Sequence, residues 1–191
     1  TEIESIALKL DAHKPSAIIN PAAYTAVDKA EEEEPRASLI NAQAPSVMAA
    51  YCRKKDIPFI HYSTDYVFNG EGGGRPFCET DETDPLNAYG RTKLAGEEII
   101  AKYAKDYLIF RTSWVFDAVG KNFVTTMLKL GADRESLKVV DDQWGAPSYA
   151  AHIATATLDA LKNAKQALRF PSGVYHLTGG GETNWKNFEK Q

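Results

Sequence analysis

Tyr89 and Lys93, four residues apart, form the most suggestive chemical pattern in this sequence. On a helix, residues at this spacing project from the same face. A phenol with a pKa of about 10 is a poor acid-base catalyst at neutral pH, but a nearby ammonium favours the phenolate. At about 4 to 5 Å and an effective dielectric constant of about 20, the attraction is worth about 3 to 4 kcal/mol. The pair therefore predicts a proton donor whose pKa is lowered towards neutrality by a lysine.

Small and hydroxyl-bearing residues follow three apolar runs of the chain, at positions 20–25, 63–65 and 112–114. In a parallel α/β sheet, ligands bind beyond the carboxyl ends of the strands, so these positions would line a cleft. For each of them alone a turn after a strand is the better explanation, and a Tyr-Lys pair at this spacing also occurs on ordinary surfaces. Their convergence at three strand ends favours a binding site.

The elements that would position these residues are visible as alternating strands and helices. Short apolar runs rich in β-branched and aromatic residues predict strands within residues 16–23, 57–63, 107–115 and 137–140. Helical periodicity predicts helices within residues 34–56, 87–106, 122–132 and 149–163. This alternation is typical of βαβ units, so we expect an α/β fold with a doubly wound parallel sheet, helices on both faces, of the Rossmann type.

The helix predicted over residues 87–106 carries the Tyr-Lys pair. Asn87 is a suitable N-cap, and Ala95, Ile99 and Tyr103 form a stripe expected to face the core. Tyr89 and Lys93 would then point away from the core, towards the cleft.

Composition narrows the function classes. The 191 residues are 43% hydrophobic and 25% charged, which predicts one soluble globular core. The net charge of -4 provides no basic field for nucleic acid or anionic lipid. Cys52 and Cys78 lie far apart and the histidines are scattered, so we expect no metal site and a reducing compartment. No apolar run approaches the roughly 20 residues of a membrane span, and the protein is expected to be cytoplasmic.

Five segments together resemble the extended short-chain dehydrogenase/reductase superfamily and, within it, the dTDP-4-dehydrorhamnose reductases. The segments follow the family's order over most of the chain and are far more specific than the Tyr-Lys pair. They are AAYTAVDKAE (22–31), HYSTDYVFNG (61–70), PLNAYGRTKLAGE (85–97), IFRTSWVF (109–116) and DDQWGAPS (141–148).

The resemblance implies a reductase that transfers a hydride from NADPH or NADH to the C4 keto group of dTDP-4-dehydro-L-rhamnose. The product would be dTDP-L-rhamnose for cell-surface polysaccharide, and the family suggests a homodimer. Tyr89 would donate the proton to the C4 oxygen, and Thr64 would hydrogen-bond that carbonyl. Lys93 would tune Tyr89 and hold the nicotinamide ribose, with Asp65 assisting.

The resemblance also implies three sets of site residues. The catalytic set is Thr64, Asp65, Tyr89 and Lys93. The cofactor set is Ala22, Ala23, Thr25, Tyr89 and Lys93. The substrate set is Val67, Phe68, Trp114, Asn122 and Gln143. Core packing is the competing interpretation of Val67, Phe68 and Trp114.

One family feature is not found in the sequence. A complete member opens with a strand and a G-x-x-G-x-x-G turn that binds the dinucleotide pyrophosphate. The glycine-rich stretches at 69–77 and 178–184 have neither that spacing nor that context. We therefore expect residues 1–191 to be a partial Rossmann-type NAD(P)-binding domain, with elements of a small substrate-binding region after about residue 113. Its N-terminal strand-turn-helix and part of the C-terminal substrate domain would be missing.

Two other functions share part of the pattern. The regulatory subunit of methionine adenosyltransferase resembles the HYSTDYVF and Tyr-Lys segments and is a non-catalytic dinucleotide-binding protein. Nucleotide-sugar epimerases and dehydratases share the Tyr-Lys pair, but they need a tightly held NAD. Trp114 and the segment 141–143 favour the reductase.

Overall fold

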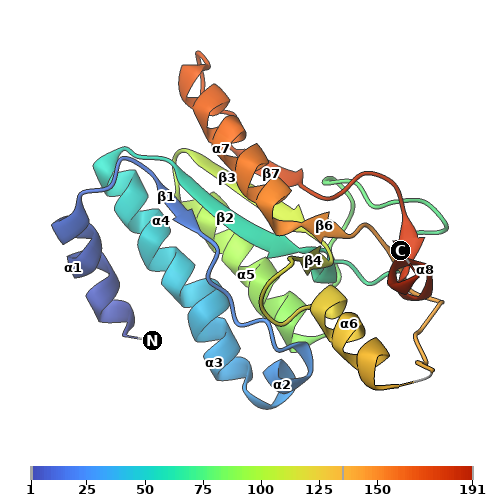
Figure 1. Cartoon of the computed structure of the whole chain (residues 1–191). Coiled ribbons are helices and arrows are strands. Elements are labelled where there is room, and N and C mark those ends of the chain that lie inside the picture. The colour runs from blue at the N-terminus through green and yellow to red at the C-terminus, as the bar shows by residue number, and fades with distance from the viewer. Residues whose placement is uncertain (1, 135, 191) are drawn as a thin grey trace. The chain divides into compact units, whose positions relative to one another are not determined.

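The computed structural model (Figure 1) describes residues 2–134 and 136–190. These residues form two compact units. The first unit contains the residues up to Arg111 together with Ala164–His176. The second contains Thr112–Asn163 and the residues from Leu177 onward. The substrate-binding region expected after about residue 113 stays a prediction, because a compact unit does not reveal what it binds.

A four-stranded sheet is the centre of the first unit. Its order is β1 (Ile18–Asn20), β2 (Phe59–Thr64), β3 (Tyr107–Thr112) and β7 (Gly173–His176) (Figure 1). β1 pairs with β2 in parallel, and β3 pairs with β7 in parallel. Helices flank this sheet, which confirms the predicted Rossmann-type α/β fold.

The strand predicted at 137–140 was wrong, and β7 takes its place in the sheet. Residues 137–140 have no strand structure, and Val140 is 51% exposed. The run has strand propensity, but it pairs with no strand of the described sheets, and pairing decides whether such a run becomes a strand. β7 escaped prediction because its apolar stretch is short and begins with a glycine.

Helices α1 (Ile3–His13), α4 (Ala44–Lys55) and α5 (Ala88–Tyr103) belong to the same unit (Figure 1). Between β1 and α4 the chain forms α2 (Val27–Glu32), α3 (Glu34–Ser38) and a π-helical turn, η1 (Leu39–Gln43). The core joins strand residues Phe59 and Ile109 to Cys52 of α4 and Ile100 of α5, all of them fully buried. Burial of these side chains holds α4 and α5 against one face of the sheet.

The buried face of α5 differs from the predicted one. Tyr103, expected in the core, is 42% exposed, whereas Lys93, Gly96 and Glu97 are buried. Gly96 explains the rotation, because it lies directly against the backbone of η1. A β-carbon at Gly96 would lie 2.2 Å from the carbonyl oxygen of Asn41. The close approach of the α5 and η1 backbones therefore decides which face of α5 is buried, and the periodicity of apolar residues does not.

Gly96→Ala is expected to destabilise the protein by about 1 to 3 kcal/mol, because backbone must move to admit the methyl group. Gly131→Ala in α6 (Phe123–Asp133) is the matched control, since a β-carbon there meets nothing within 4 Å. The control should gain about 0.5 to 1 kcal/mol from helix propensity. Urea unfolding of the two variants measures both changes. Equal stability of Gly96→Ala and the native protein would contradict the packing argument.

The second unit contains α6, most of α7 (Ala150–Gln166) and α8 (Trp185–Glu189), as the predicted helices at 122–132 and 149–163 anticipated. β4 (Val115–Phe116) pairs in parallel with β6 (Ser148–Tyr149). β5 (Trp144–Gly145) pairs antiparallel with β8 (Thr183–Asn184). Across the part of the chain that the structure describes, no helix has the length and apolar character needed to cross a membrane.

Candidate active site

The end of β2 places Thr64 and Asp65 at the carboxyl edge of the sheet. Thr64 caps a short 3-10 helix, η2 (Asp65–Val67), by accepting a hydrogen bond from the Tyr66 amide at 3.2 Å. Its hydroxyl donates to Asp65 Oδ1 at 3.0 Å. Thr64 is only 5% exposed, and burial raises the pKa of the Asp65 carboxyl. The hydroxyl is thus held in a fixed, largely desolvated position.

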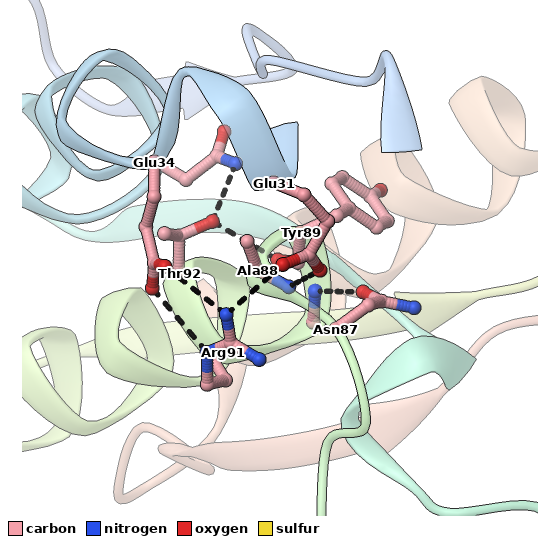
Figure 2. Close-up of polar contacts among 9 residues, drawn as sticks. Glu31, Glu34, Asn87, Ala88, Tyr89, Arg91 and Thr92 are labelled. Atoms are coloured by element: carbon pink, nitrogen blue, oxygen red, sulfur yellow. Dashed lines mark hydrogen bonds and ion pairs between the residues drawn. The ribbon is translucent and has the colours of Figure 1, made fainter. Parts of the chain in front are cut away.

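Tyr89 lies in the first turn of α5, and two side chains fix the backbone on either side of it (Figure 2). Asn87 caps the helix as predicted, accepting from the Gly90 amide at 2.8 Å. Glu31 of α2 accepts from the Ala88 amide at 2.6 Å. Arg91 in turn binds Glu31 at 3.5 Å. Two of the otherwise unpaired amides at this helix end are therefore satisfied by side chains next to the tyrosine.

Glu31 was missed in the sequence. It lies in an acidic run that resembles a solvated surface, and its contact with α5 joins residues 57 positions apart. Glu34, in the same run, binds Arg91 at 3.0 Å (Figure 2). The acidic residues therefore connect α2 and α3 to the helix that carries Tyr89.

The predicted lowering of the Tyr89 pKa is wrong for this structure. Burial raises the pKa of Tyr89 to about 12; a hydrogen bond with Thr64 acts in the opposite direction, and the nearby Asp65 carboxyl adds to the rise. Lys93 does not offset this, because its Nζ points inward and donates to the Tyr62 carbonyl at 2.6 Å. Burial also lowers the pKa of Lys93 to about 8, opposed by Glu97. Desolvation is thus the largest influence on the pKa values of both groups.

Asn41 is a second site-supporting residue that the sequence analysis missed. It is fully buried in the π-helical turn η1, and it binds both the amide and the carbonyl of Tyr24, at 2.8 and 3.2 Å. Its amide also donates to Thr92 Oγ1 at 3.1 Å, and Thr92 donates to the Tyr89 carbonyl at 3.0 Å. A polar residue within the short run 39–42 was the available signal. Asn41 links the loop after β1 to the Tyr89 helix.

The predicted cofactor residues Ala22, Ala23 and Thr25 lie in that loop. Ala22 and Thr25 are exposed and Ala23 is half-buried. Asn20, the last residue of β1, is the register partner of His61 on β2. The loop therefore leaves the sheet at the same edge as Thr64, which brings the predicted cofactor and catalytic residues of the first unit to one side of the sheet.

Val67 and Phe68 are interior residues. Val67 is fully buried, and Phe68 is 8% exposed. The Phe68 ring stacks on Phe77 with centroids 4.4 Å apart, and the Arg111 guanidinium lies 5.0 Å from its centroid. These contacts favour the packing interpretation over the predicted contact with a sugar.

Trp114, Asn122 and Gln143 all have partners within the second unit. The Trp114 ring stacks on Trp185 at 3.6 Å, and Gln143 Oε1 accepts from the Trp185 indole at 3.1 Å. Asn122 forms a capping box with Thr125 at the start of α6, and its amide donates to two backbone carbonyls. Each side chain thus has a structural role inside its own unit, and their substrate roles stay predictions.

Within residues 2–134 and 136–190, no three His, Cys, Asp or Glu side chains gather closely enough to hold a metal ion. Thr64, Tyr89 and Lys93 supply a hydroxyl, a phenol and an amine, which suit proton transfer and hydrogen bonding to a carbonyl.

The family model described as RmlD substrate binding domain matches residues 1–191. The chain belongs to this family. A dTDP-4-dehydrorhamnose reductase from Burkholderia thailandensis is 48% identical over 188 residues, covering 97% of this chain and 63% of that protein. One from Escherichia coli K12 is 46% identical over 187 residues, covering 97% of this chain and 61% of that protein.

A solved member of similar fold is the dTDP-4-dehydrorhamnose reductase from Bacillus anthracis in complex with NADP. It matches with a TM-score of 0.91 and 35% identity, covering 99% of this chain and 65% of that one. The chain therefore spans less than two thirds of the length of these relatives of the RmlD family.

Proposed function

We propose that the protein is a reductase that uses NADPH or NADH to reduce the C4 keto group of dTDP-4-dehydro-L-rhamnose to dTDP-L-rhamnose. The observation that carries this proposal is the family match along the whole chain, with relatives at 46 to 48% identity named for that reaction. The placement of Thr64 at the end of β2 and of Tyr89 in the first turn of α5 supports it, because the Thr64 side chain is near enough to influence the pKa of Tyr89.

The proposed chemistry of the chain is proton donation to the sugar. Tyr89 donates its phenolic proton to the C4 oxygen while Thr64 hydrogen-bonds the same oxygen. Because burial raises the pKa of Tyr89 to about 12, the phenol is protonated at neutral pH, which is the form a donor requires. In the free protein the Thr64 hydroxyl donates its single proton to Asp65 Oδ1, so in this proposal the hydroxyl turns from that carboxyl to the C4 oxygen when the sugar binds.

In this proposal the loop after β1 borders the dinucleotide cofactor. Ala22 and Ala23 carry only methyl groups, and Ala22 is exposed. Lys93 Nζ has a further N–H besides the one that it donates to the Tyr62 carbonyl. In this proposal that second donor holds the nicotinamide ribose. When bound, the cofactor supplies the hydride that reaches C4.

The setting of this activity is also proposed. The partner is a nucleotide-sugar, and the product serves cell-surface polysaccharide synthesis in the cytoplasm. The protein acts as a homodimer. The substrate side includes Trp114, Asn122 and Gln143, as the family resemblance suggests.

The test is an assay of the intact protein with dTDP-4-dehydro-L-rhamnose and either NADPH or NADH. We expect loss of reduced-cofactor absorbance with matching formation of dTDP-L-rhamnose, and none when the sugar is omitted. Absence of turnover with both cofactors would contradict the function. Stable binding to a methionine adenosyltransferase without turnover, or epimerised sugar with tightly retained NAD, would support the alternatives instead.

A further inference from the structure

Three buried polar side chains form a row on the α5 side of the sheet, and only one of them has a role in the proposed chemistry. Asn20 of β1, His61 of β2 and Lys93 of α5 are 6%, 0% and 2% exposed. His61 Nδ1 lies 3.2 Å from Asn20 Nδ2, and His61 Nε2 lies 3.2 Å from Lys93 Nζ. The imidazole therefore connects the strand that precedes the cofactor loop to the lysine.

The direction of the first hydrogen bond follows from a backbone amide. Ala22 N–H can only donate, and it donates to Asn20 Oδ1 at 3.2 Å. The Asn20 side chain must then present its NH₂ group to His61, so Nδ1 of the imidazole accepts. Burial holds the pKa of His61 well below its ordinary value, and a charge on Lys93 would lower it further, so the ring is neutral. A neutral ring whose Nδ1 accepts carries its single proton on Nε2.

The Nε2 proton points at Lys93, and this constrains the lysine. An ammonium has three donors and no acceptor, whereas a neutral amine has one lone pair. A neutral Lys93 accepts from His61 and still donates to the Tyr62 carbonyl at 2.6 Å. A charged Lys93 would need the other tautomer, whose Nδ1–H would face the NH₂ group of Asn20. Two donors would then oppose each other in the interior.

The charged groups around Lys93 have opposing effects on the protonation state of its amine. Glu97 lies one turn further along α5 and favours the cation, but Arg111 of β3 binds that carboxylate at 2.7 Å. Burial brings the pKa of Lys93 to about 8. At such a value, one hydrogen-bond preference is enough to decide the charge near neutral pH.

We propose that Asn20 and His61 are positioning residues that hold Lys93 uncharged in the free protein by fixing the Nε2–H tautomer of His61. The part of this inference that concerns turnover rests on the proposed function: Lys93 becomes a cation only when His61 exchanges its tautomer and gives up the Asn20 bond. Asn20 and His61 thus set the pH at which the lysine acquires its charge.

The direct test is NMR of the free intact protein with isotope-labelled histidine and lysine. The ring-nitrogen shifts of His61 should report the proton on Nε2, and the Lys93 signal, assigned with Lys93→Met, should titrate below the other lysines. A His61 proton on Nδ1 would overturn the proposal. This measurement uses no substrate or cofactor, so its outcome is separate from that of the reductase assay.

Asn20→Asp should reverse the tautomer preference of His61. A carboxylate oxygen facing Nδ1 accepts a hydrogen bond where the amide of Asn20 donated one. We expect the Nδ1–H tautomer and a Lys93 titration moved to higher pH by roughly one unit or more. The same substitution in a His61→Gln background is the matched control for the added charge, since the tautomer is gone while the carboxylate remains. If the pH at which Lys93 titrates moved equally in both backgrounds, the added charge alone would be acting, and the proposed role of the His61 tautomer would be refuted.

If the reductase function holds, the pH profile of kcat should move with the Lys93 titration in Asn20→Asp. A fall in activity with an unchanged profile would indicate only structural damage and would count against the positioning role.

Discussion

Tyr89→Phe is expected to lower kcat by about 10²-fold or more, because the substitution removes the phenolic proton and nothing else. The ring would keep its edge-on contact with Tyr66, whose centroid lies 5.5 Å away. The amides on either side of position 89 would remain bound by Asn87 and Glu31. Fold and NADPH affinity should therefore change little. Steady-state kinetics with dTDP-4-dehydro-L-rhamnose and calorimetric titration of NADPH measure the two quantities.

Tyr66→Phe is the matched control for this experiment. The residue makes the same ring contact and loses the same hydroxyl, but it is 41% exposed. Its kcat should stay within about twofold of the native value. Near-native turnover by Tyr89→Phe, or equal losses in the two variants, would remove Tyr89 from the role of proton donor.

Glu97→Ala is expected to destabilise the protein by about 3 to 5 kcal/mol, because it leaves the Arg111 guanidinium buried without a counter-charge. The carboxylate accepts from Arg111 Nε at 3.0 Å and from Nη2 at 2.7 Å, and the two side chains are 4% and 7% exposed. Chemical denaturation measures the loss, which requires no assumption about function.

Two further variants make the Glu97 experiment specific. Glu34→Ala removes an exposed partner of Arg91 at 3.0 Å, and it should cost no more than about 1 kcal/mol. Combining Glu97→Leu with Arg111→Met replaces both charges by apolar groups and should recover most of the lost stability. If the double replacement were as unstable as Glu97→Ala, the uncompensated charge would not be the cause.

The helix that carries Tyr89 and the pKa predicted for Tyr89 show how far analysis of sequence patterns reaches in this site. The four-residue spacing correctly places Tyr89 and Lys93 on one helix, and Asn87 caps that helix as its residue type suggested. The Coulomb argument for a lowered Tyr89 pKa nevertheless failed. It assumed a solvated pair, whereas both side chains lose water to residues from other elements, and that loss dominates.

Contacts between residues far apart in the sequence could not be predicted from local sequence patterns either. Glu31 and Asn41 are separated from the residues that they support in α5 by 57 and 51 positions. Glu31 resembles a surface acid, and Asn41 resembles a misplaced polar residue in an apolar helix. Their roles follow only from which backbone groups lie opposite them.

Local pattern was sufficient for several elements of this protein: the first three strands of its sheet, the helical stretches within residues 34–56 and 87–106 and the position of the Tyr-Lys pair follow from periodicity and caps, whereas α2 and β7 were not predicted. These features depend on interactions within a few residues, which a sequence displays directly. Packing set the rest: Gly96 selects the buried face of α5 through its contact with η1, and Asn20 sets the direction of hydrogen bonding at His61. Both depend on groups distant in sequence whose separation, burial and donor direction exist only after the chain has folded.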